Sequence, residues 1–452
     1  MTLDGIGLFF QRDQTWFPEA KGLVDYITRC QNYLQRGKPV VDIAVYTGDE
    51  MPRRALTPDR LVPMLPGLFG PGRIASEQQR LANVGCPMEE SPVGVRHSAG
   101  ILDLKDWINP LHGYQYDSMN PDGLSRWLSK LYGSVDYDLP DYRVLVVPKG
   151  AMLNVGTMQK IDSLKLYGIT VITEPYTEAT LPGLPPDVIL PEGIAYQHRK
   201  AGHTHYFFLS NQTDSVRHFR AKFRSKGKMT WMEDPLTGNA LTFHEEREGD
   251  YSCVDITLPK HGSVFVMSGF LVTDKWTVPK DMEEARPLGK NLVWNITFRE
   301  NREQAKTREL FDWSQSDNNR IRYFSGHARY TTTFTMKKQD MKHASWWLRL
   351  PGLKDVAHVW LNGADLGIVW TEPYQVEMGR HLKSGKNTLE IEVVNTWHNA
   401  LRGADQGKAP YDGIWTNARF RTKGDDLLPA GLLLTPQLIR QPHDTFRALF
   451  ND

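Results

Sequence analysis

The chain has 452 residues, and its 54 Lys and Arg nearly balance its 53 Asp and Glu, for a formal net charge of +1. This length fits about three domains. The near-zero charge excludes a general attraction to nucleic acid or to anionic membranes. No run of about eighteen apolar residues occurs, so no membrane-inserted helix is expected, and the N-terminus lacks the basic start and apolar core of a signal peptide.

The cysteines and glycines give no sign of a metal or a cofactor. Cys30, Cys86 and Cys253 lie far apart, without the spacing of a metal site or of a disulfide framework, and are expected to be buried thiols. No GxGxxG motif follows a predicted strand, so no nucleotide cofactor is expected. The 13 Trp fit either stacking on sugar rings or the aromatic core of a large β-sandwich.

Residues 1–37 resemble one unit of a larger barrel. The apolar run Leu8–Phe10 ends in the polar cluster Gln11–Gln14, and a helix is predicted from about Pro18 until Gly37 closes it. Its apolar positions at helical spacing are Leu23, Tyr26, Ile27, Cys30 and Leu34. One strand end followed by one helix is typical of the last unit of a (β/α) barrel.

Residues 38–192 alternate between strands and helices. Buried-type strands are predicted at Pro39–Tyr46, Tyr142–Val147 and Ile169–Thr173, with a helix at Thr157–Leu166. This alternation predicts an α/β domain built on a parallel sheet with both faces covered.

Residues 193–290 change to an all-β pattern that predicts a β-sandwich. The predicted strands are Gly193–Arg199, Thr204–Ser210, Lys228–Met232, Ala240–His244 and Gly262–Met267.

Residues 291–452 read as an antiparallel β-sandwich of the jelly-roll type. Val356–Leu361 alternates with period two, Asn362-Gly363 is a hairpin turn, and Leu366–Trp370 is the returning strand. A further strand is predicted at Thr388–Val394, and Ile321–Tyr330 is expected among the opening strands.

Three motifs carry a resemblance to a known family. Phe10–Phe17 reads FQRDQTWF, Val394–Asn399 reads VNTWHN, and Leu427–Leu432 reads LLPAGL. Together they resemble the C-terminal portion of glycoside hydrolase family 106, the inverting α-L-rhamnosidases. The resemblance implies a multidomain α/β plus all-β fold. A flavodoxin-like domain would be followed by a β-sandwich and a galactose-binding-like jelly roll, with a short barrel remnant at the N-terminus. It also suggests a periplasmic or secreted protein.

The resemblance leaves the catalytic residues unknown. An inverting glycosidase needs two carboxyl groups roughly 6.5–9.5 Å apart, and in this family they would come from barrel segments upstream of Leu8. The residues that can be carried over as substrate-binding are Gln11, Arg12, Asp13, Gln14 and Trp16. Amide and guanidinium groups bind sugar hydroxyls, and Trp16 could stack on a ring. Alternatively, Arg12 and Asp13 stabilise the turn into the helix.

Other candidate sites compete with this loop. Trp370, Tyr374, Trp397 and Trp415 could form an aromatic sugar platform or belong to the core of the jelly roll. Asp49-Glu50 follows a predicted parallel strand, where ligands often bind, but it also fits a solvated loop. His203 and His205 share a strand face without a third ligand, so no zinc site is expected.

Three functions remain open from the sequence. The chain is the C-terminal part of an α-L-rhamnosidase-like hydrolase, a carbohydrate-binding or scaffolding protein without a barrel, or a hydrolase that uses carboxylates of the α/β domain. In each of the first two, the expected partner is carbohydrate. An exposed Leu8–Phe10 patch would promote self-association, so a chain shortened to begin near Lys38 is expected to associate less.

Overall fold

The computed structural model describes residues 10–49, 61–69, 74–75, 111–134, 139–225, 229–242, 246–268, 275–279, 284–341, 344–416 and 426–447. These residues are rich in β-sheet and form two compact units. The first unit takes in the described parts of Met1–Arg29 and Val272–Asp452, and the second takes in those of Cys30–Ser91 and Arg96–Leu271.

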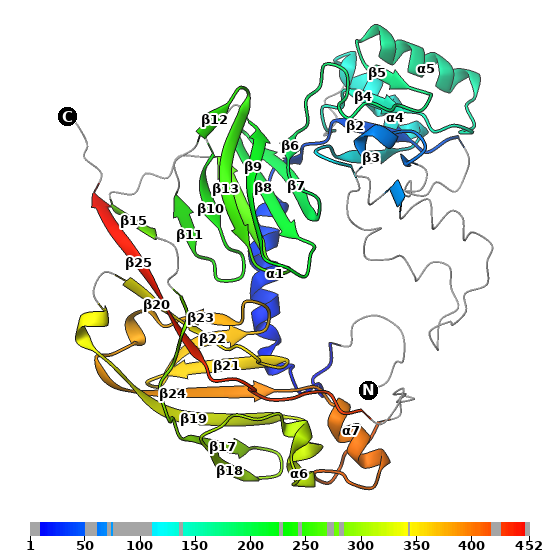
Figure 1. Ribbon diagram of the computed structural model, residues 1–452. Helices are drawn as coiled ribbons and strands as arrows, with labels where there is room; N and C mark the ends of the chain where they lie inside the picture. Colours follow the sequence, from blue (N-terminus) through cyan, green and yellow to red (C-terminus); the bar gives the residue numbers. More distant parts are fainter. Residues whose placement is uncertain are drawn as a thin grey trace. The chain divides into compact units, whose positions relative to one another are not determined.

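The second unit contains a four-stranded parallel sheet with two helices (Figure 1). Its strands, in the order β3-β2-β4-β5, are β3 (Tyr116–Met119), β2 (Ile43–Tyr46), β4 (Val144–Val146) and β5 (Thr170–Ile172). The helices are α4 (Pro121–Leu131) and α5 (Val155–Leu166). Each helix follows an Asn, Asn120 or Asn154, whose side chain accepts a hydrogen bond from the first turn.

Both faces of this sheet are buried, which explains why its strands are apolar at successive positions. Ile43 and Val45 face one core, which residues 61–69 cover. Ala44 and Tyr46 face the other core, which α4 and α5 cover with side chains such as Trp127. Period-two alternation is therefore absent from these strands.

The strand predicted over Pro39–Tyr46 is two strands in two different sheets. β1 (Lys38–Pro39) pairs antiparallel with β7 (Ile194–Ala201), whereas β2 joins the parallel sheet. The prediction of a single strand was wrong because the apolar run continues through the change of partner. Asp42 marks that change, and its carboxylate pairs with Arg224 at 2.5 Å.

Two antiparallel sheets pack face to face in the rest of the second unit. The six-stranded sheet has the order β1-β7-β8-β14-β10-β11, with β8 (Thr204–Asn211), β14 (Ser263–Ser268), β10 (Met229–Glu233) and β11 (Ala240–Thr242). The four-stranded sheet has the order β12-β13-β9-β6, with β12 (Glu246–Glu248), β13 (Tyr251–Leu258), β9 (Arg217–Arg224) and β6 (Val188–Ile189).

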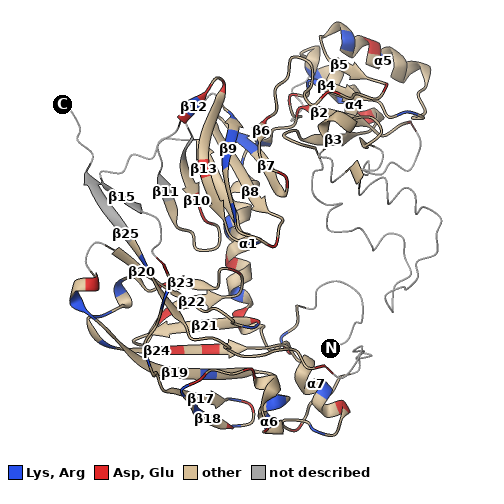
Figure 2. Cartoon of the chain, viewed as in Figure 1, with Lys and Arg blue, Asp and Glu red and all other residues tan. Residues whose placement is uncertain are grey.

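Sequence analysis missed β9 because its alternate positions are basic rather than simply polar. Arg220 pairs with Glu246 at 2.5 Å and with Asp255 at 3.3 Å across the sheet surface, and Lys222 pairs with Glu248. Figure 2 shows basic positions on β9 and acidic positions on β12. Ala221 and Phe223, at the alternate positions, are fully buried. A ladder of cross-strand ion pairs thus stabilises the outer face of this sheet, with each exposed pair contributing little alone.

The first unit contains a two-sheet jelly roll. One sheet has the order β18-β17-β19-β24-β21-β22, with β17 (Trp294–Phe298), β18 (Gln304–Thr307), β19 (His327–Met336), β24 (Gly385–Val394), β21 (Val356–Leu361) and β22 (Ala364–Val369). The other contains β15 (Lys275–Pro279), β16 (Arg286–Pro287), β25 (Gln437–Arg447), β20 (Ala344–Arg349) and β23 (Gln375–Glu377).

Two short helices interrupt the strands of the jelly roll. α6 (Asn319–Arg322) precedes β19, and α7 (His398–Asp405) follows β24. The expectation of a strand across Ile321–Tyr330 was therefore wrong at its beginning: the side chain of Asn318 caps a helical turn there. The Asn362-Gly363 hairpin is confirmed, with φ values of 54° and 83° that this turn requires.

Residues 10–29 join the jelly roll in the first unit. The 3-10 helix η1 (Pro18–Ala20) leads directly into α1 (Lys21–Leu34). This confirms the predicted helix and its beginning near Pro18. Of the predicted apolar run, Phe10 is 43% exposed, whereas Leu8 and Phe9 lie outside the described residues.

The LLPAGL segment crosses the aromatic core of the jelly roll. Trp313 Nε1 donates to the Tyr330 hydroxyl at 2.7 Å, and the backbone N–H of Leu432 donates to the same hydroxyl at 3.3 Å. Gly431 has a φ of 103°, and a Cβ at this position would lie 2.4 Å from Trp313 Nε1. Only glycine allows the backbone this close to the indole ring.

We expect Gly431→Ala to lower the free energy of unfolding of the jelly roll by about 3 kcal/mol, because a clash with Trp313 adds to backbone strain. Urea unfolding followed by Trp fluorescence measures this. The matched control is Gly367→Ala, since Gly367 has a similar φ of 107° and open space around it. The control should cost only the strain, about 1–2 kcal/mol. Equal losses in both variants would contradict the packing argument.

Candidate functional site

The loop predicted to bind substrate and the helix after it are held on the jelly roll by three contacts. Thr15 Oγ1 donates to the backbone oxygen of Asn395 at 2.5 Å, and Trp397 Nε1 donates to the backbone oxygen of Asp13 at 2.6 Å. At the start of α1, the Tyr26 ring packs edge-to-face on Trp370 at 5.8 Å. The segment from Asp13 to Tyr26 is therefore held at both ends.

The five residues predicted to bind substrate differ in their exposure to solvent. Arg12 and Asp13 are exposed, Gln11 and Trp16 are half-buried, and Gln14 is only 7% exposed. Gln14 is buried because the segment packs on the jelly roll. The Trp16 ring meets Phe10 edge-to-face at 5.2 Å.

The four aromatic residues of the predicted platform have four different environments. Trp370 packs against α1, Trp397 binds the Asp13 backbone, and Tyr374 packs on the hydrophobic core. Trp415 is 78% exposed. Two of the four thus hold the N-terminal segment in place, and Trp415 alone presents most of its ring to solvent.

The VNTWHN motif supplies the contacts that shape this edge of the jelly roll. Asn395 is buried, donates to the Phe324 backbone oxygen at 2.9 Å and accepts from the Gly326 N–H at 3.0 Å. Asn399 donates to the Leu428 backbone oxygen at 2.8 Å and accepts from its N–H at 2.9 Å. The motif therefore connects β24 to both the β19 entrance and the LLPAGL segment.

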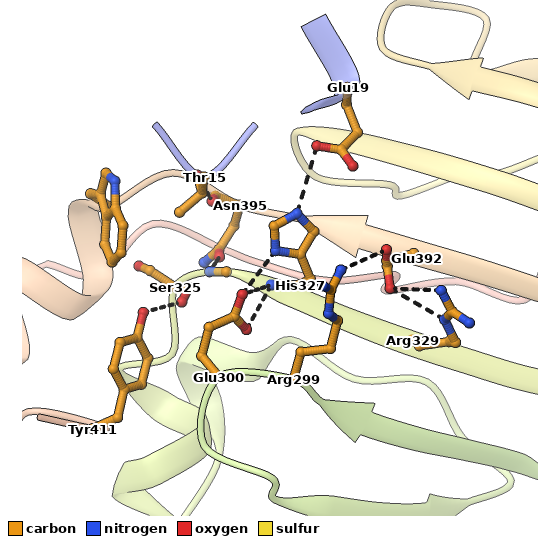
Figure 3. A network of polar contacts seen from close by, with 12 residues as sticks. Thr15, Glu19, Arg299, Glu300, Ser325, His327, Arg329, Glu392, Asn395 and Tyr411 are labelled. Atoms are coloured by element: carbon orange, nitrogen blue, oxygen red, sulfur yellow. Dashed lines mark hydrogen bonds and ion pairs between the residues drawn. The ribbon is translucent and has the colours of Figure 1, made fainter. Parts of the chain in front are cut away.

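An ionic cluster that the sequence did not reveal lies beside these contacts (Figure 3). His327 Nδ1 lies 2.8 Å from Glu300 Oε1, and its Nε2 lies 3.7 Å from Glu19 Oε2. Burial lowers the pKa of His327, but the neighbouring carboxylates of Glu19 and Glu300 outweigh this and raise the pKa to about 9. The three residues are far apart in sequence, so no local motif could have signalled them.

The second unit has a buried polar cluster of its own. His198 Nδ1 lies 2.8 Å from Asp187 Oδ2, and its Nε2 lies 2.8 Å from His205 Nδ1. Arg224 contacts Asp42 at 2.5 Å and Asp187 at 3.6 Å. Burial lowers the pKa of His205 to about 4, so this ring is neutral at physiological pH.

The members of this cluster satisfy one another through hydrogen bonds and ion pairs. Asp187 is 2% exposed and His198 is 1% exposed, so both depend on their partners for solvation. His205 serves as one of those partners, because its Nδ1 lies 2.8 Å from His198 Nε2. Within the described ranges, no group of three or more His, Cys, Asp or Glu could hold a metal ion.

Asp49 performs a structural role. Its carboxylate accepts hydrogen bonds from Tyr46 Oη at 2.5 Å, from the Asn154 N–H at 2.6 Å and from Thr157 Oγ1 at 2.9 Å. These contacts join the end of β2 to the first turn of α5. Glu50 lies outside the described residues. The hypothesis of a hydrolase built on Asp49 therefore finds a carboxylate that is already engaged.

The described cysteines are buried and carry free thiols, as expected. Cys30 and Cys253 are 8% and 2% exposed, and Cys86 lies outside the described residues. None of the helices in the described part of the chain is long and apolar enough to cross a membrane.

Two family models match different parts of the chain. Residues 1–72 match the alpha-L-rhamnosidase family, and residues 304–424 match the galactose-binding domain-like family of glycosyl hydrolase 2. The first match contains the Gln11–Trp16 loop and α1. The second contains β19, β24 and the VNTWHN motif.

Two known proteins with names of glycoside hydrolases also match the chain. A rhamnosidase from Novosphingobium sp. PP1Y has a similar structure, with a TM-score of 0.68 and 22% sequence identity, over 96% of this chain and 42% of that protein. A protein from Formosa agariphila, provisionally named a β-glucuronidase, is 36% identical over 121 residues, which are 26% of this chain and 10% of the relative. The chain spans less than half the length of either protein.

The family-model match confirms the resemblance to the α-L-rhamnosidases of glycoside hydrolase family 106 over residues 1–72. The second family model also confirms a galactose-binding-like domain in a sheet-rich fold. At 22% identity, the structural match establishes the fold alone.

We expect Asn399→Ala to lower the free energy of unfolding by about 2–3 kcal/mol. The substitution removes two hydrogen bonds and leaves the backbone N–H and carbonyl of Leu428 without their side-chain partner. Thermal unfolding of the purified chain measures this. Asn295→Ala is the control, since Asn295 is exposed on β17 of the same domain and should change stability by less than about 0.5 kcal/mol. A similar stability in both variants would contradict the proposed role of Asn399.

Proposed function

We propose that this chain is the C-terminal accessory region of an α-L-rhamnosidase-like glycoside hydrolase that acts on rhamnose-containing glycans. Residues 1–37 would be a barrel remnant, 38–192 a flavodoxin-like domain, 193–290 a β-sandwich and 291–452 a galactose-binding-like jelly roll. The observation that carries this proposal is the fold match to a rhamnosidase along 96% of the chain, together with the rhamnosidase-family match at residues 1–72.

The carboxylates beside the candidate loop support an accessory role. Asp13 is exposed, but Glu19 is only 6% exposed and faces His327. An inverting glycosidase needs one carboxyl group to protonate the leaving oxygen and another to activate water. Glu19, paired and buried, is poorly suited to either step, so we assign the catalytic pair to other parts of a longer protein.

In this proposal the Gln11–Trp16 loop contributes to the edge of the substrate site. Its exposed Arg12 can donate to sugar hydroxyls, since a guanidinium group offers five N–H donors. Trp16 is half-buried against Phe10 and leaves part of its ring open for stacking. Thr15 and Asp13 hold the loop through their contacts to the jelly roll, which reduces the entropy lost on binding.

We also propose that the chain self-associates through apolar side chains of its N-terminal segment. Phe10, Val24 and Ile27 are each more than 40% exposed and supply apolar surface on residues 10–29. We therefore expect a chain shortened to begin near Lys38 to associate less than the full chain, as measured by light scattering at matched concentration.

We expect the purified 452-residue chain to show no measurable turnover of an aryl α-L-rhamnoside. The assay follows release of the aryl group over several hours, with an active inverting rhamnosidase as the positive control. Steady turnover that a single Asp→Asn or Glu→Gln substitution in this chain abolishes would refute the accessory assignment.

The alternative function is a carbohydrate-binding protein without catalysis, and the 78% exposure of Trp415 favours it. Stacking of a sugar ring on an indole contributes on the order of 1 kcal/mol. If this function is correct, titration calorimetry with rhamnose-containing oligosaccharides should give binding that Trp415→Ala weakens at least about fivefold. Trp360→Ala, in the same domain, tests whether any Trp loss does the same. Absence of binding would leave the accessory role as the function of the chain.

A further inference from the structure

His327 connects residues 10–29 to the six-stranded sheet by charge. It is the first residue of β19, and its ring lies between two carboxylates from different parts of the chain. Glu300, after β17, accepts from His327 Nδ1 at 2.8 Å and from the His327 backbone N–H at 3.0 Å. Glu19, in η1, approaches Nε2 from the other side at 3.7 Å (Figure 3).

Glu19 is buried in a way that requires a counter-charge. Its side chain is 5% exposed, and Oε2 makes no hydrogen bond within the described part of the chain. A buried carboxylate without a partner costs several kcal/mol. The imidazole of His327 is the cation that faces this oxygen, so a proton on Nε2 compensates for the burial of Glu19.

The other charges around His327 come from β24, from β19 and from the residue that follows β17. Glu392 on β24, 4% exposed, accepts from Arg299 at 3.3 Å and from Arg329 at 3.2 Å. Arg329 also approaches Glu390 at 3.5 Å. Tyr411, a neutral titratable group in the same network, donates its hydroxyl proton to the Ser325 backbone oxygen (Figure 3).

The charge balance of this patch depends on the His327 proton. The patch has four carboxylates and two guanidinium groups. Both guanidinium groups, of Arg299 and Arg329, pair with Glu392 or Glu390. Glu19 and Glu300 therefore have His327 as their shared counter-ion.

We propose that protonated His327 is a latch that holds residues 13–22 on the jelly roll through Glu19, and that loss of its proton releases this segment. The proposal goes beyond the accessory function and does not require the loop to bind sugar. His327 acts here as a positioning residue: it holds Glu19, just after the Gln11–Trp16 loop, and does not itself contact a ligand.

The direction of the pH dependence follows from the pKa of His327. Glu19 and Glu300 raise this pKa to about 9 in the folded chain, against the opposing effect of burial, from 6.5 for an ordinary histidine. The stabilisation is therefore complete below about pH 6.5 and is lost as pH rises through about 9. The latch is closed at neutral pH and opens under alkaline conditions.

Hydrogen exchange of the full chain, followed by mass spectrometry, tests the latch. With exchange times corrected for pH, we expect protection of residues 13–22 to fall at least about tenfold between about pH 7 and pH 10. Protection of β19 and β24 should stay constant. In His327→Gln, the segment should already be poorly protected at neutral pH and should lose its dependence on pH.

Two further variants separate the latch from a general effect on stability. Glu19→Gln keeps the size of the side chain but removes its charge, so it should lower the His327 pKa and move the opening to lower pH. His358→Gln is the matched control. His358 pairs with Asp365 at 2.8 Å on the same sheet, within one hairpin, and its loss should leave residues 13–22 protected.

Three results would overturn the proposal. The first is unchanged protection of residues 13–22 in His327→Gln at neutral pH. The second is loss of protection of the segment and of β24 together, which would make His327 a stabiliser of the whole domain. The third uses the unmodified chain, in case the variant does not fold: histidine NMR showing that the ring of His327 titrates while protection of the segment stays constant.

Discussion

The first unit depends on the burial of Glu19 against the jelly roll. The Glu19 carboxylate is almost fully shielded from solvent, and His327, at the start of β19, supplies the opposite charge that offsets the cost of this burial. The contacts of Thr15 and Trp397 then fix the preceding turn, so η1 and α1 begin from a defined position. Through this arrangement, a segment from the N-terminal end becomes part of a domain built from the C-terminal end.

The motifs that resemble glycoside hydrolases contribute backbone contacts to this arrangement. Trp397 holds the turn at Asp13, while Asn399 holds the backbone of Leu428. Of these two contacts, the one made by Trp397 joins the rhamnosidase-family segment to the galactose-binding-like domain. Since each side chain is committed to a backbone partner, substitution acts first on how the loop is presented and only then on what the loop could bind.

The second unit joins a parallel sheet to a β-sandwich by a different device. Asp42, from the residues just before β2, and Asp187, just before β6, share Arg224 of β9, and His198 completes the group. A buried cluster of this kind is stable only when every member is satisfied. It contributes specificity of packing between the two parts of this unit, because an altered arrangement would leave a buried charge without a partner.

Local pattern in the sequence determined much of the fold. The helix after Pro18, the Asn362-Gly363 hairpin and the apolar strands of the parallel sheet follow from spacing and turn chemistry. Tertiary contacts decided the rest. Lys38–Pro39 pairs with β7, and the chain changes sheets near Asp42 without a loop signal in the sequence. The His327 cluster exists because folding brings Glu19, Glu300 and His327 together. Periodicity reports which face of an element is buried, whereas the identity of the partner depends on residues distant in sequence.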